Sequence, residues 1–185
     1  MAIEITYRRT SRMSMRIVKN GDVHVSVPLG YPSKLVDEFI AEHADWIESA
    51  RKRNAERVKG QNDFFSKLPL QTRAQAKEAL DKLTAIIMPM VERNAEIMGV
   101  KPSAVYYKRL KSRWGACKYN DKSICFSIYL LLLPEWCIEH VVVHELCHLK
   151  VPNHSERFYK LMDTYYPRWR EARKETRRLC QNKIQ

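Results

Sequence analysis

The chain has 185 residues, of which 45% are hydrophobic and 29% charged. This composition excludes an intrinsically disordered chain, and the length allows one substantial core or a main domain with a small appendage. The net charge of +12 favours a polyanionic partner such as nucleic acid or a nucleotide, although a basic protein without such a partner fits it equally well.

Cysteine usage and hydropathy indicate a cytoplasmic protein. The five cysteines are odd in number and form no C-x-x-C pair, which argues against a disulfide framework or a thiolate zinc site. We expect them to be reduced and mostly buried. Arginines early in the chain interrupt any secretory leader, and the longest apolar run, 128–133, is too short to cross a bilayer. No membrane contact is therefore expected.

The first part of the chain predicts a β-hairpin followed by a helix. Apolar residues alternate with polar ones over 13–17 and 23–27, and Asn20-Gly21 between them is typical of a tight turn. A helix is expected to begin at Tyr31-Pro32-Ser33. Its single apolar stripe consists of Leu35, Val36, Phe39, Ile40, His43, Trp46 and Ile47. We expect His43 to be a packing residue of this stripe, not a metal ligand.

A boundary is expected after this helix. Residues 51–59 hold five basic residues and one acid, which indicates a solvated helix end, and the pattern breaks at 60–63. We therefore expect an N-terminal hairpin and helix subdomain over 1–62 and a second domain over 63–185. The second domain is predicted to begin with a long helix over about 72–98, which Pro89 should kink or restart.

Strand patterns follow Gly99. A strand is predicted over 104–110, and residues 114–117 with 124–130 predict a hairpin that turns near Asn120-Asp121. The next helix begins at Pro134, with a buried side made of Ile138, Val141, Val142, Leu146 and Leu149. Pro152-Asn153 ends it.

Two shorter helices complete the prediction. His154 or Ser155 should cap the first of them, and Pro167 separates it from a basic terminal helix. The elements together predict an α+β fold, in which an N-terminal β-hairpin and helices precede a small antiparallel sheet and a long helix.

The helix after Pro134 contains His144-Glu145-Leu146-Cys147-His148. Two histidines four residues apart project from one helix face, so both imidazoles can reach one metal ion. Glu145, beside the first histidine, can reach a water on that ion. The pattern predicts a zinc hydrolase.

A catalytic zinc needs three protein ligands and one open position. His154 is the expected third ligand, because the break at Pro152-Asn153 lets the chain turn back toward the helix. His140 shares the helix face but lies ~12 Å of helical rise from His148, so we expect it beside the site and not on the ion. One Zn²⁺ held by His144, His148 and His154 is therefore predicted.

Neutral imidazole ligands leave the ion nearly its full charge, which lowers the pKa of a bound water toward ~7. Glu145 would then act as the general base. The alternative is a polar cluster without metal, which is electrostatically poor because it buries a carboxylate without a cation. Manganese or nickel could also occupy a three-histidine site, and zinc is expected from the ligand type and the chemistry.

Residues 101–120 contain six basic residues and no acid. This stretch precedes the metal helix and could hold anionic substrate groups or stabilise an oxyanion, with Arg113 as the preferred residue and Trp114 beside it. A solvated edge strand protected by Lys and Arg explains most of these charges equally well.

Several of these segments resemble the YgjP-like metal-dependent hydrolases. The similar motifs are Ser112-Arg113-Trp114-Gly115-Ala116-Cys117, Pro134, residues 141–149, Asn153-His154-Ser155 and Phe158. The family is of the zincin type, related to minimal gluzincin peptidases and more distantly to SprT-like proteases. The resemblance implies a zincin-like catalytic domain, with His144, His148 and His154 as zinc ligands and Glu145 as catalytic base. Metzincin membership is rejected, since Val151 stands where that pattern requires Gly.

Three functions are compatible with this reading. The first is a zinc-dependent peptidase, in which an extended peptide pairs with an edge strand near 124–130. The second, an activity attributed to the family, is hydrolysis of a nucleoside triphosphate such as UTP with release of diphosphate. The third is a DNA-associated SprT-like protease or binding module whose terminal helix contacts phosphates. Its basic residues are Arg168, Arg170, Arg173, Lys174, Arg177 and Arg178, and a solvated amphipathic helix explains them more simply.

Overall fold

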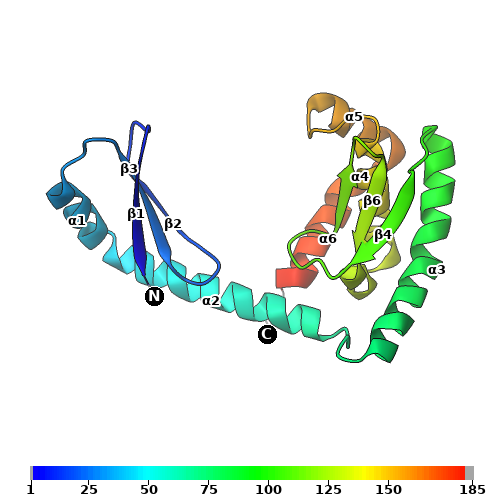
Figure 1. Ribbon diagram of the computed structural model, residues 1–185, viewed down its shortest axis with the longest axis horizontal. Helices are drawn as coiled ribbons and strands as arrows, with labels where there is room; N and C mark the ends of the chain where they lie inside the picture. The colour runs from blue at the N-terminus through cyan, green and yellow to red at the C-terminus, as the bar shows by residue number, and fades with distance from the viewer. Residues whose placement is uncertain (1, 182–185) are drawn as a thin grey trace. The chain divides into compact units, whose positions relative to one another are not determined.

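The computed structural model describes residues 2–181. The chain folds into two compact units, Met1–Asn62 and Asp63–Gln185. The first is drawn in blue and cyan in Figure 1, and the second in green to red.

A three-stranded sheet forms the centre of the first unit. Its strands β1 (Ile3–Arg8), β2 (Ser14–Ile17) and β3 (Val23–Pro28) lie in the order β1-β3-β2. The predicted hairpin is confirmed, because β2 and β3 are antiparallel with Met15 opposite Val25. β1 was not predicted, and it pairs parallel with β3. Because a parallel partner must come from outside the hairpin, the alternation within 13–27 carried no signal for it.

The single helix predicted after Ser33 is wrong. The structure has two helices, α1 (Ser33–Glu42) and α2 (Ala44–Ser66), which are separated at His43. Nδ1 of His43 lies 2.8 Å from the carbonyl oxygen of Phe39, the oxygen that the backbone N–H of His43 would otherwise bond. That N–H bonds Ile40 instead. The ring also packs on Phe39 at a centroid distance of 4.4 Å, so His43 is a packing residue, as expected.

The predicted apolar stripe is correspondingly divided. Val36 and Ile47 are buried with the β3 valines, whereas Leu35 and Trp46 are 43% and 40% exposed. The break expected at 60–63 is also wrong, because α2 continues through Gly60 to Ser66. Phe64, in its last turn, belongs to the core of the second unit, and this burial outweighs the low helix propensity of Gly60.

The second unit begins with α3 (Arg73–Met98), as predicted. Thr72 caps it, accepting a hydrogen bond from the backbone N–H of Gln75, whose side chain accepts in return from the backbone N–H of Thr72. The helix runs through Pro89 and does not restart there.

The sheet of the second unit has strands β4 (Ala104–Lys108), β5 (Gly115–Lys118) and β6 (Ser123–Ser127), in the order β4-β6-β5. The predicted hairpin is confirmed as the antiparallel pair β5 and β6. The sheet is mixed and not wholly antiparallel, because β4 runs parallel to β6. The second hairpin strand is also shorter than predicted, since Ile128–Leu132 forms a 3-10 turn.

Three helices complete this unit: α4 (Glu135–His148), α5 (Glu156–Tyr165) and α6 (Trp169–Gln181). Of the predicted buried side of α4, Ile138, Val141, Val142 and Leu146 are buried and Leu149 is half-buried. Ser155 is the N-cap of α5. The expected α+β class is confirmed, and no helix among residues 2–181 is long and apolar enough to cross a membrane.

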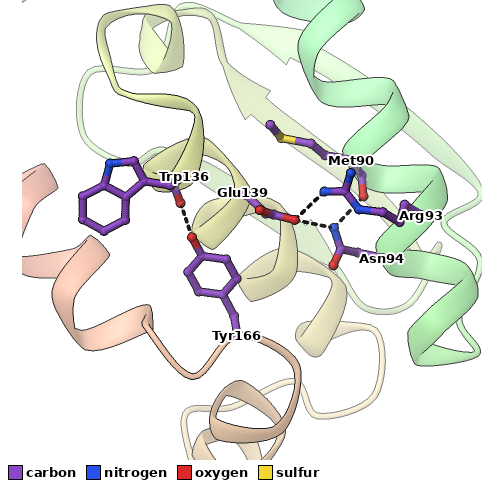
Figure 2. Close-up of polar contacts among 6 residues, drawn as sticks. All are labelled: Met90, Arg93, Asn94, Trp136, Glu139 and Tyr166. Atoms are coloured by element: carbon purple, nitrogen blue, oxygen red, sulfur yellow. Dashed lines mark hydrogen bonds and ion pairs between the residues drawn. The ribbon is translucent and has the colours of Figure 1, made fainter.

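Polar contacts hold α4 in place (Figure 2). Oε1 of Glu139 accepts hydrogen bonds from Nη2 of Arg93 at 2.5 Å and from Nδ2 of the buried Asn94 at 3.2 Å, both on α3. The hydroxyl of Tyr166 donates to the carbonyl oxygen of Trp136 at 2.6 Å. These contacts hold α4 from two sides, at positions five (Glu139) and eight (Trp136) residues before His144.

Candidate metal centre

Three histidine side chains converge at the end of α4. His144 and His148 lie one turn apart on the helix, and His154 lies in the loop before α5. Their Nε2 atoms are 3.2 Å apart for 144 and 148, 3.2 Å for 148 and 154, and 3.1 Å for 144 and 154. The fully buried Phe158 packs against all three rings at centroid distances of 4.9, 4.6 and 4.8 Å. Phe158 thus holds the three rings in place by packing against them. The sequence motif that contains Phe158 did not predict this contact.

The three nitrogens cannot satisfy one another by hydrogen bonds. Nδ1 of His148 lies 3.0 Å from the carbonyl oxygen of Val151, so it is the protonated nitrogen, and Nε2 of the neutral ring presents a lone pair. Whichever nitrogens of His144 and His154 carry protons, at least one of the three Nε2–Nε2 pairs then brings two lone pairs, or two N–H groups, against each other. Tetrahedral zinc with bonds of ~2.0–2.1 Å would separate its nitrogen ligands by roughly 3.3 Å. The cluster therefore fits a metal ion.

The environment keeps the imidazoles of His144 and His148 neutral, which is the form that binds metals. Burial, with smaller contributions from neighbouring histidines, lowers the pKa of His144 to about 3. Burial also lowers the pKa of His148. His140 lies beside this cluster and outside it, as expected, with its ring centroid 6.1 Å from that of His144.

The carboxylate of Glu145 is buried between α4 and β5. Only 4% of the residue is exposed, and burial raises its pKa to about 8, although a hydrogen bond from the backbone N–H of Cys117 and the charge of Arg113 oppose this shift. A Cβ on Gly115 would lie 2.5 Å from Oε1 and 2.6 Å from Cγ of Glu145. The glycine therefore provides the space that this side chain occupies.

Comparison with known proteins decides the family. The family model described as "YgjP-like, metallopeptidase domain" matches residues 11–70 and 65–179. The chain belongs to the YgjP-like family. Membership makes it a metallopeptidase-type, metal-dependent hydrolase.

Two solved structures are similar to part of this YgjP-like chain. The metallopeptidase zymogen abylysin of Pyrococcus abyssi is 23% identical, with a TM-score of 0.46 over 53% of this chain and 99% of its own. The zymogen jannalysin of Methanocaldococcus jannaschii is 18% identical, with a TM-score of 0.45 over 50% of this chain and 94% of its own. No curated protein matches.

The space beside Gly115 gives a first prediction for this YgjP-like site. Gly115→Ala should lower the turnover number roughly 10- to 100-fold, because the new methyl group must displace the Glu145 carboxylate. Steady-state kinetics together with metal content test this expectation. Bound metal should stay unchanged, since the substitution replaces none of the three imidazoles that could hold it. Wild-type turnover in the alanine variant would contradict the prediction.

The buried Glu145 gives a second prediction, for the metal-free protein. Its folded pKa of about 8 exceeds the value of 4.5 for a free carboxyl, so the folded state holds a proton that the unfolded state loses between these pH values. Stability contributed at low pH is therefore lost as pH rises toward 8. The increase in unfolding free energy that Glu145→Gln gives the metal-free protein should be larger at pH 8 than at pH 5 by roughly 2–4 kcal/mol. Urea unfolding at both pH values tests this, and an equal effect at both would contradict it.

The structure corrects which strand is available to a peptide. β6, the strand proposed for pairing near 124–130, has β4 on one side and β5 on the other. The open edge beside α4 is β5. The carbonyl of Trp114 bonds the backbone N–H of Ser127 at 2.8 Å, so the alternate residues Gly115 and Cys117 direct their backbone groups away from β6.

The basic segment of this YgjP-like chain is divided between site and core. Arg113 acts electrostatically on Glu145. Trp114, in contrast, packs its ring on Phe64 and Phe65 at centroid distances of 6.3 and 6.1 Å. At the start of α6 and along it, Arg168, Arg170 and Arg178 form ion pairs with Glu171, Asp163 and Glu175 respectively.

Proposed function

We propose that this YgjP-like chain is a zinc-dependent peptidase. His144, His148 and His154 would hold the ion through their Nε2 atoms, and the convergence of these three atoms within 3.2 Å carries the proposal. When bound there, zinc supplies a Lewis acid and an activated water at neutral pH.

Glu145 would serve as the proton carrier of the reaction. It follows His144 on α4, and its buried carboxylate is held against β5 by the backbone N–H of Cys117. Burial favours the protonated carboxyl, whereas a nearby cation favours the carboxylate, so a bound ion would bring its pKa closer to working pH. Glu145 can then take a proton from the attacking water and deliver it to the leaving nitrogen.

An extended peptide would bind along β5. The outward N–H and C=O of Gly115 and the outward C=O of Cys117 suit antiparallel pairing with a substrate strand, whereas the N–H of Cys117 is engaged by Glu145. The carbonyl to be attacked would then lie near Glu145, which contacts the Gly115 position. Arg113 would stabilise negative charge that develops on the substrate.

The test uses chelator-stripped protein reloaded with one equivalent of zinc. It is incubated with an unfolded protein and, separately, with a panel of nucleoside triphosphates, and the products are identified by mass spectrometry. We expect zinc-dependent cleavage of peptide bonds. Diphosphate release without peptide cleavage would replace this proposal by the nucleotide hydrolase, and activity that survives chelation would contradict both.

A further inference from the structure

The N-terminal sheet has an open, apolar edge. β1 lies at one end of the order β1-β3-β2, and its Ile3, Ile5 and Tyr7 are 43%, 40% and 45% exposed. Such an edge is a template for pairing with another strand. The opposite edge, β2, has four residues against six in β1, and its Ser14 and Arg16 are exposed polar residues. β1 is therefore the edge suited to a partner.

The backbone of the apolar residues points outward. The carbonyl of Arg8 accepts a hydrogen bond from the backbone N–H of Leu29 at 3.1 Å, so even-numbered residues of β1 turn their backbone groups toward β3. In a parallel pair this direction alternates along the strand. Ile3, Ile5 and Tyr7 consequently present N–H and C=O groups to the open edge. Their side chains lie on the face of the β3 valines, with which they are in register.

A groove of about 450 Å³ adjoins this edge on the same face. Ile3, Ile40, Ala44 and Ile47 line it together with the charged residues Glu48 and Arg51. The groove offers space for an apolar side chain projecting from a strand added to β1.

We propose that β1 pairs antiparallel with β1 of a second copy of this chain, about a two-fold axis at Thr6. The residues of β1 favour this register over the alternatives. It places Glu4 opposite the partner's Arg8, and Ile5 opposite the partner's Tyr7. Because Ile5 and Tyr7 both have outward backbone groups, this pair exchanges two hydrogen bonds, and symmetry repeats it.

Charge complementarity distinguishes a second copy from an unrelated peptide. The two-fold axis generates two Glu4 to Arg8 pairs, and both side chains lie on the face opposite the groove. Oε2 of Glu4 lies 3.0 Å from Nε2 of His24, which leaves Oε1 for the partner's guanidinium. An unrelated extended peptide would match the apolar row but has no reason to match these charges.

Charge exchange at the two positions tests the register. Sedimentation equilibrium of the full chain should show dimerisation that Glu4→Arg or Arg8→Glu each weakens roughly tenfold or more, because like charges then face each other twice. An equimolar mixture of the two variants should recover wild-type association, since every pair becomes complementary. Misfolded variants could not produce this recovery.

A cross-link gives an independent measurement. Thr6 faces itself across the axis in a non-hydrogen-bonded pair, where Cβ atoms lie about 4.5–5.5 Å apart. Oxidised Thr6→Cys should therefore form a covalent dimer, whereas wild type and Arg16→Cys, on the far edge, should not. A wild-type chain that stays monomeric at all concentrations, or variants that fail to associate when mixed, would overturn the proposal.

Discussion

Glu145→Gln is expected to lower the turnover number for peptide cleavage by ~10²- to 10⁴-fold, the usual contribution of a positioned general base. The amide keeps the shape of the buried side chain but cannot take a proton from water. Glu145 is only 4% exposed, and its side chain lies against Gly115. The measurement is kcat and KM on an unfolded protein substrate, with zinc content determined on the same samples.

Glu139→Gln is the matched control, because it makes the same substitution six positions earlier on α4. Glu139 contacts Arg93 and Asn94 and is not part of the histidine cluster. Its turnover should remain within a few-fold of wild type. Equal losses in the two variants would indicate a general disturbance of α4, and full activity of Glu145→Gln would remove Glu145 from the mechanism.

His154→Ala is expected to weaken zinc binding by at least ~100-fold and to abolish measurable peptide cleavage. One of three convergent nitrogens is lost, and the remaining pair on α4 cannot complete the ligand set that a catalytic zinc requires. The fold should persist, because His154 is exposed and lies in the loop before α5. Competition titration with a chromogenic zinc chelator measures the affinity, and circular dichroism checks the fold.

His140→Asn separates ligation from proximity. His140 lies beside His144, with ring centroids 6.1 Å apart, but its nitrogens do not join the cluster. The variant should bind one equivalent of zinc with affinity near that of wild type. Loss of zinc in this variant, with retention in His154→Ala, would reverse the assignment of the third ligand.

Local patterns predicted the elements around the site well. The helix period placed His144 and His148 on one face, and Pro134 and Ser155 marked helix starts that the structure contains. The predictions that failed are those in which a side-chain hydrogen bond, or a strand distant in the chain, changed the local structure. His43 ends α1 by bonding the Phe39 carbonyl, and the identity of the edge strand depended on β4 joining β6 from nineteen residues away.

The sequence by itself determined that two imidazoles and a carboxylate share one stretch of helix, because spacing along a helix is set by backbone geometry alone. Only the tertiary structure decided that His154 closes the cluster and that Phe158 packs beneath it. It also decided that Glu145 is buried against Gly115 and that β5 is the open edge. These contacts join segments whose approach depends on strand pairing and on the packing of α4, α5 and the sheet, and neither is encoded in a local period.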